Sequence, residues 1–252
     1  MNTDPQQRPA QYLALTCGSQ ARAVYAAAAV ARSLVTVRLL DQGLHNTPSQ
    51  LRVQLQRQID EVAPDQVDAI LLVYGLCGNG TLGLCARETP LVIPRAHDCI
   101  TLYLGSRQRY QQEISAYPGT YWCSQDYLER NRQGDEVTLG ASASLYQQYV
   151  EKYGQDNADY LMDALGAWAA HYQRLVYIET SAPDSASYRR RAEEKAAQRS
   201  LRFESLPGNP CLVEALITGQ WNEADFLIVP PHHHIVRGND ELIIRAAPAA
   251  HS

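Results

Sequence analysis

The chain has 252 residues, a length that predicts one large domain or two small ones at roughly 150 residues each. Lys and Arg total 22 against 27 Asp and Glu, giving a net charge of −5, and the longest run of like charge is three arginines. This balance argues against a protein that tracks a nucleic-acid backbone. The hydrophobic fraction of 45% predicts a packed core and excludes wholesale disorder.

No apolar run approaches the roughly 18 residues that a membrane span needs, and the first residues carry no apolar leader. We therefore expect a cytoplasmic protein that does not enter a membrane. Six cysteines in a chain of this kind are too few for a disulfide scaffold and should stay reduced. They are then core residues, redox groups or metal ligands.

The first hundred residues alternate between strand and helix patterns. Strands are expected at 12–16, 34–40, 69–74 and 91–93, and the strand at 34–40 should be buried on both faces. An Ala-rich helix is expected at 20–32. A second helix should start at Thr47 and Pro48 and end at Pro64, and Asp98 could cap a third.

The rest of the chain repeats this pattern less regularly. Residues 117–140 are expected to form an irregular loop or a small hairpin. Residues 141–172 are expected to form a helical connection. Further strands are expected at 175–178, 201–204, 226–229 and 241–245, with helices at 187–198 and 211–216. The prediction is an α/β fold whose parallel sheets carry helices on both faces, with two Rossmann-like βαβ half-domains over 1–116 and 141–252.

Three cysteines follow predicted parallel strands, at the edge where ligands bind in open α/β sheets. These are Cys17, Cys77 and Cys99, and His97 shares the last loop. Three thiolates suit an iron–sulfur cluster or a single iron, zinc or nickel ion, and leave one coordination position open for a substrate. His97 could replace one thiol. The alternative is that these cysteines are small buried hydrophobes.

A glycine-rich turn follows the third predicted strand. Gly78, Gly80 and Gly83 match G-x-G-x-x-G, the dinucleotide fingerprint. Pro90 leaves room for only a short helix, however, and the next strand ends without an acidic residue, so we do not expect NAD. The exposed amides of the turn and Asn79 could instead hold a carboxylate or phosphate.

Other polar residues follow the same strands. Arg95 could clamp a carboxylate and His97 could act as an acid or base near neutral pH. The three histidines 232–234 cannot all face one ion, so a solvated loop is the simpler interpretation. Among 15 tyrosines, Tyr74, Tyr117 and Tyr121 are candidates for the wall of a substrate site.

Three strings of the sequence are distinctive: YGLCGNGTLGL at 74–84, PLVIPRAHDCITLYLGS at 90–106 and PGTYW at 118–122. They resemble a bacterial and archaeal family named domain of unknown function 1638, over nearly the whole chain. The resemblance implies that Cys17, Cys77 and Cys99 are the motif cysteines of the family. It also implies one-carbon chemistry, since members are often encoded beside corrinoid-dependent methyltransferases. The architecture is also loosely similar to quinolinate synthase, at the level of fold only.

Together these features predict a metal- or iron–sulfur-dependent enzyme, of lyase or transferase type, that acts on a small polar substrate. The metal would be held by Cys17, Cys77 and Cys99. The substrate would lie against Tyr74, Gly78, Asn79, Gly80 and Tyr121, with Arg95 and His97 as catalytic residues. The alternative is a non-catalytic protein that binds a corrinoid or metallocofactor for a methyltransferase system. A third, less favoured hypothesis is a nucleotide-dependent oxidoreductase that uses the glycine turn.

Overall fold

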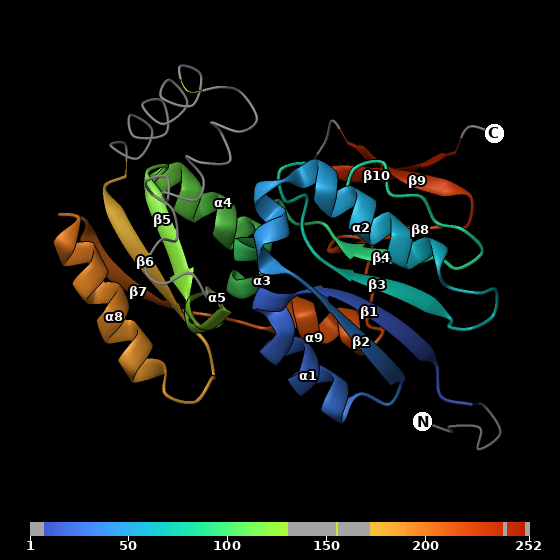
Figure 1. Ribbon diagram of the computed structural model, residues 1–252, viewed down its shortest axis with the longest axis horizontal. Helices are drawn as coiled ribbons and strands as arrows, with labels where there is room; N and C mark the ends of the chain where they lie inside the picture. The colour runs from blue at the N-terminus through green and yellow to red at the C-terminus, as the bar shows by residue number, and fades with distance from the viewer. Residues whose placement is uncertain (1–7, 131–154, 156–171, 239–240, 250–252) are drawn as a thin grey trace. The chain divides into compact units, whose positions relative to one another are not determined.

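The computed structural model describes residues 8–130, 155, 172–238 and 241–249 (Figure 1). The chain divides into two compact units. Unit 1 comprises residues 1–111 and 208–252, and unit 2 comprises residues 112–207.

Unit 1 is built on a five-stranded sheet with the order β2-β1-β3-β4-β8. Four strands run parallel: β1 (Gln11–Cys17), β2 (Leu34–Leu40), β3 (Ala69–Val73) and β4 (Leu91–Pro94). The fifth, β8 (Phe226–Val229), pairs antiparallel with β4, with Leu91 opposite Val229. A separate antiparallel hairpin joins β9 (His233–Arg237) to β10 (Ile244–Pro248).

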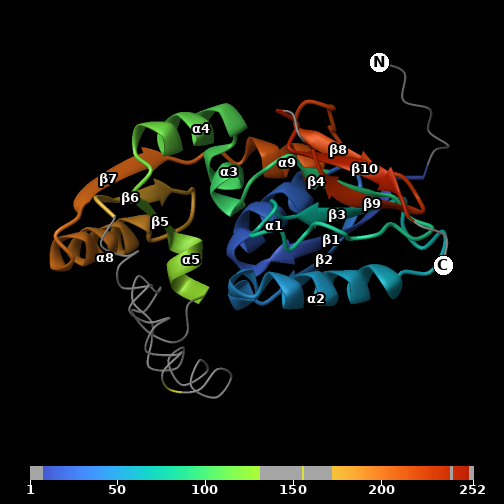
Figure 2. The same cartoon turned by 90° about the horizontal axis from the view of Figure 1, so that it is seen from above.

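Helices cover both faces of this sheet (Figures 1 and 2). On one face, α2 (Pro48–Asp60) buries Leu51, Leu55 and Ile59 in a core shared with the β9–β10 hairpin. On the other face lie α1 (Ala21–Val30) and α9 (Cys211–Ile217). Two short 3₁₀ helices, η1 (Gly18–Gln20) and η2 (Gln42–Asn46), follow β1 and β2. The third βα connection leads from β4 into α3 (Cys99–Leu104).

Unit 2 contains a three-stranded parallel sheet with the order β5-β6-β7. It is entered through α4 (Arg107–Ala116), and its strands are β5 (Thr120–Ser124), β6 (Arg174–Glu179) and β7 (Arg202–Pro207). The helix α5 (Gln125–Arg130) follows β5, and α8 (Ser185–Gln198) buries Ala192 and Ala196 against the sheet. These elements form a second βαβ unit with its own core.

A buried arginine joins the amino-terminal ends of the three strands of unit 2. The Nη2 group of Arg174 lies 2.6 Å from Glu113, its Nη1 group pairs with Glu204, and its Nε donates to Thr120 at 2.8 Å. The guanidinium also lies 4.0 Å from the ring centroid of Tyr117. Arg174 lines a pocket of about 240 Å³ together with Tyr117, Gly119, Gln173 and Arg202. Because its charge is matched by two carboxylates, we assign Arg174 a structural role.

The predicted fold class is confirmed: the protein is α/β, with parallel sheets flanked by helices. Strand 34–40 has the predicted bounds, but it is an edge strand with alternating exposure and is not buried on both faces. Residues 117–140, expected to be irregular, contain β5 and α5. Most of the expected helical connection at 141–172 lies outside the described residues.

The expected second half-domain, 141–252, differs from the unit that the contacts define. Residues 208–252 pack with unit 1, because β8 pairs with β4 and the β9–β10 hairpin buries Ile235 and Ile244 beside α2. Among the described residues, no helix combines the length and apolar character needed to cross a membrane.

Candidate thiol site of unit 1

The three motif cysteines lie at the carboxyl ends of adjacent strands. Cys17 is the last residue of β1, Cys77 lies in the turn after β3, and Cys99 opens α3 after β4. Since β1, β3 and β4 are parallel neighbours, their carboxyl ends share one edge of the sheet. All six cysteines of the chain lie in the described residues, and none forms a disulfide.

Burial affects the protonation of the thiols at this edge. The pKa of Cys77 is raised to about 12, mainly by burial and to a smaller extent by charge on Asp98 and Cys17. Burial also raises the pKa of Cys99 well above its ordinary value, and charge on Asp98, Cys77 and Cys17 acts in the same direction. The hydroxyl of Ser19 donates a hydrogen bond to Cys17 Sγ at 3.2 Å. Cys77 and Cys99 are therefore protonated at neutral pH.

The side chains do not form a ready-made coordination sphere. In the described part of the chain, no three side chains of the types His, Cys, Asp or Glu are arranged to hold a metal ion. A metal at this edge would require the cysteine side chains to lose their protons and to rotate toward a common centre.

The turn that carries Cys77 has an unusual backbone. Cys77, Gly78 and Asn79 have φ values of 46°, 64° and 70°, so three consecutive residues are left-handed. Glycine and asparagine tolerate this region, whereas cysteine adopts it at an energetic cost. Such strain is often found at functional sites.

The turn is held against the segment that leads to Cys99. The amide of Leu76 donates to Ala96 O at 2.8 Å, and the amide of Cys77 donates to His97 O at 3.1 Å. Gly75 makes this approach possible, because a Cβ atom there would lie 2.6 Å from Asp98 N and 2.8 Å from Ala96 O. Gly75 is not recognisable from the sequence, since the segment that it faces is identified only by the fold.

Three predicted substrate-binding residues belong to the same turn. Gly78 is exposed and lies against Pro48, whereas Gly80 is buried and a Cβ atom there would lie 2.9 Å from Leu51 Cδ2. Gly80 is therefore explained by packing against α2. Asn79 is exposed, and its Oδ1 accepts a hydrogen bond from Arg237 at 2.6 Å.

Tyr74, the residue after β3, is buried beside the thiols. Burial raises the pKa of its hydroxyl strongly, and charge on Cys17 and Cys77 would raise it further. The hydroxyl has no hydrogen-bond partner among the described residues. A buried, unpaired hydroxyl costs free energy, so this position favours a bound group that the protein itself does not supply.

His97, Asp98 and Tyr110 form a connected group. The exposed ring of His97 stacks on Tyr110 with a centroid distance of 5.8 Å, and the Tyr110 hydroxyl donates to Asp98 Oδ2 at 2.8 Å. Asp98 Oδ1 accepts from the amides of Ile100 and Thr101, which confirms the predicted helix cap. Burial raises the pKa of Asp98 against these hydrogen bonds. Tyr110 was missed because its link to Asp98 spans a helix boundary.

Arg95, predicted to clamp a substrate, makes structural contacts instead. It is buried, and its Nε donates to Glu223 O at 2.9 Å and to Phe226 O at 3.2 Å. Its Nη1 donates to the carbonyl oxygens of Leu242 and Ile244. These bonds fasten β4 to the carboxyl-terminal segment, so we leave Arg95 out of the proposed site.

The remaining candidates lie elsewhere. Tyr121 belongs to the core of unit 2, where its ring meets Tyr172 edge-on at 6.0 Å. The histidine run begins at a left-handed His232 that lies 3.7 Å from Glu88, and His234 pairs with Cys85 in an isolated β-bridge.

The thiol environments predict an order of alkylation. At pH 8, iodoacetamide should modify the exposed Cys211 faster than Cys77 or Cys99, because these two thiols are only partly exposed and burial raises the pKa of Cys77 to about 12 and that of Cys99 well above its ordinary value. Peptide mass spectrometry over time would measure this order. In urea the difference should disappear, and fast labelling of Cys77 in the folded protein would contradict the described burial.

Comparison with known proteins gives one match. The model of the family described as "Protein of unknown function (DUF1638)" matches residues 39–217. No curated protein matches the chain, and no solved structure matches it. The match covers more than half of the chain and includes Cys77, Cys99 and the glycine turn, with Cys17 outside its bounds. The chain belongs to the DUF1638 family.

Proposed function

We propose that this protein is a cytoplasmic, metal- or iron–sulfur-dependent enzyme that acts on a small polar substrate at the edge formed by β1, β3 and β4. Cys17, Cys77 and Cys99 would hold an iron–sulfur cluster or a single iron, zinc or nickel ion. Three protein ligands leave a coordination position at which a substrate oxygen or nitrogen is polarised.

The observation that carries this proposal is the position of three cysteines at the carboxyl ends of the neighbouring parallel strands β1, β3 and β4. Free cysteine in a core is common, but three that influence one another at the ligand-binding edge of a parallel sheet match the donor set of a soft metal. The unpaired hydroxyl of Tyr74 adds support, since it lies beside Cys17 and Cys77 and could donate to a thiolate or a substrate oxygen.

The chain's own residues then have distinct roles. Tyr74 orients the bound group from the buried side of the site. His97 is exposed, and its imidazole can give a proton to a substrate or take one from it. Tyr110 and Asp98 fix the position of His97 through the ring stack and the 2.8 Å hydrogen bond.

Metal analysis of cysteine variants tests the proposal. Protein purified anaerobically should contain iron, zinc or nickel, and Cys17→Ser, Cys77→Ser or Cys99→Ser should each lower the content at least 10-fold. Cys85→Ser and Cys211→Ser are matched controls, because these cysteines are not among the proposed ligands. Both variants should keep the metal content of the wild type. A metal-free wild-type protein, or equal content in all five variants, would remove the proposal.

The pKa values predict a pH dependence. The raised pKa values of Cys77 and Cys99 mean that these thiols carry protons in the metal-free protein at pH 7. Metal binding must displace them, so affinity for Zn²⁺ should rise with pH and about two or three protons should be released per ion. Calorimetry in buffers of different ionisation enthalpy measures this number. Release of no protons would show that the cysteines are not the ligands.

The alternative role, a handler of a corrinoid or metallocofactor for a methyltransferase system, uses the same thiols without turnover. Replacing His97 with Asn separates the two roles. In an enzyme, turnover should fall about 100-fold while metal content persists. In a handler, transfer of the cofactor to a partner protein should be unchanged.

A further inference from the structure

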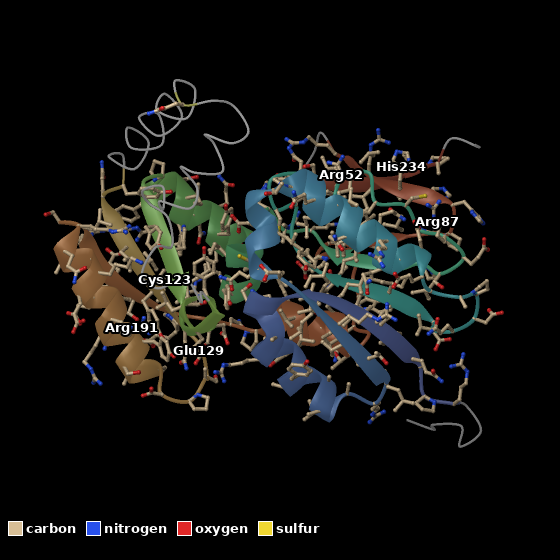
Figure 3. The ribbon with its side chains drawn as sticks, viewed as in Figure 1. Arg52, Arg87, Cys123, Glu129, Arg191 and His234 are labelled. Carbon is tan, nitrogen blue, oxygen red and sulfur yellow. The ribbon has the colours of Figure 1, made fainter. Side chains whose placement is uncertain are left out.

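Two arginines from distant parts of the chain meet at Asn79. Arg52, on α2, donates from Nη2 to Asn79 O at 3.0 Å, and Arg237, at the end of β9, donates from Nη2 to Asn79 Oδ1 at 2.6 Å. Figure 3 labels Arg52 on the helix that lies beside the turn. Both side chains are at exposed positions. Each guanidinium keeps further N–H donors for another acceptor.

These arginines carry unbalanced positive charge. In the described part of the chain, neither forms an ion pair with a carboxylate, whereas Arg57 on the same helix pairs with Glu61 and Arg87 pairs with Asp60. The first turn of α2 contains no acidic residue. Two like charges held at one residue repel each other unless an anion lies between them.

The backbone of the turn adds donors at the same place. Gly78 and Asn79 are exposed residues whose amides donate to no described residue, while the amides of Cys77 and Gly80 donate to His97 O and Cys77 O. Consecutive amides in such a conformation form a concave anion-binding surface. Pro48, the first residue of α2, packs against Gly78 and brings the positive end of that helix near.

From this convergence we propose an oxyanion site formed by Arg52, Arg237 and the amides of Gly78 and Asn79, which binds a phosphate group. Two guanidinium groups from different elements and two amides offer more donors than a planar carboxylate can accept, whereas a phosphate has three free oxygens. The site begins one residue after Cys77. Its role in holding the phosphoryl group of a substrate rests on the proposed function, but the binding of the anion does not.

Calorimetry on the full chain tests the site. Inorganic phosphate and glycerol 3-phosphate should each bind saturably with a Kd below about 1 mM, and acetate at least 10-fold more weakly. Tighter binding of the ester than of inorganic phosphate identifies a substrate group, and the reverse identifies free phosphate. Absence of saturable binding, or tighter binding of acetate, would overturn the proposal.

Variants locate the site. Arg52→Gln and Arg237→Gln should each raise the Kd for phosphate about 10-fold or more. Arg237→Lys should raise this Kd less, because the positive charge is kept. The control variant Arg57→Gln, on the same helix as Arg52, should leave the Kd for phosphate unchanged. Equal weakening in this control, or wild-type affinity in the double variant, would refute the site.

The two proposals can fail separately. Cys17→Ser should retain phosphate binding, and Arg52→Gln should retain the metal content of the wild type. Phosphate binding in a protein that never holds metal would leave the anion site standing and remove the thiol site.

Discussion

Replacing Gly75 with alanine should destabilise unit 1 by about 3 kcal/mol and separate the loop of Cys77 from that of Cys99. The added Cβ would lie 2.6 Å from Asp98 N and 2.8 Å from Ala96 O, and both are backbone atoms. Backbone atoms cannot avoid the added Cβ by a change of rotamer, so segment 96–98 must move. Urea unfolding should show the loss of free energy, and metal content should fall with it.

A local measurement distinguishes this displacement from general loosening. The amides of Leu76 and Cys77, which donate to Ala96 O and His97 O, should exchange with solvent faster, while those in the middle of β1 should not. Gly43→Ala is the matched control, because its Cβ would meet only the side-chain oxygen of Asp41, at 3.0 Å. Equal effects in both variants would show that Gly75 is not a close-approach residue.

Local pattern was enough to predict most of the sheet of unit 1. Its parallel strands are short apolar runs separated by segments with helical periodicity or with turn residues, and this contrast marks the strands in the sequence. The parallel order then places Cys17, Cys77 and Cys99 at one edge without knowledge of side-chain positions. The helix cap by Asp98 depends only on the amides two and three residues later, those of Ile100 and Thr101, which explains why it was predictable.

Contacts between distant segments were not predictable. The pairing of Leu91 with Val229 brings residues 208–252 back to unit 1, and nothing in either strand specifies its partner or its antiparallel direction. Gly75 requires segment 96–98 opposite it, and the anion site requires Arg237 to reach Asn79 across the fold. Arg95 follows a strand as a substrate-binding arginine would, but the carbonyl oxygens that it binds come from residues 223–244.

Arg95→Met should lower the free energy of unfolding by more than about 3 kcal/mol, because each buried carbonyl left without its donor costs about 1–3 kcal/mol. The side chain is 7% exposed and donates to four carbonyl oxygens, on β8, β10 and the segments before them. Lysine would not rescue the variant, since a single ammonium cannot reach acceptors that the planar guanidinium bridges.

The loss of stability in Arg95→Met should be concentrated in the carboxyl-terminal segment. Limited proteolysis of Arg95→Met should cleave first within 223–248, while β1 and β3 stay protected. Arg57→Met is the control, because that arginine has an exposed side chain and an i,i+4 pair with Glu61 worth at most about 0.5 kcal/mol. If Arg95→Met kept full stability but lost phosphate binding or turnover, Arg95 would return to the site as a substrate ligand. Its four carbonyl contacts make the structural outcome the expected one.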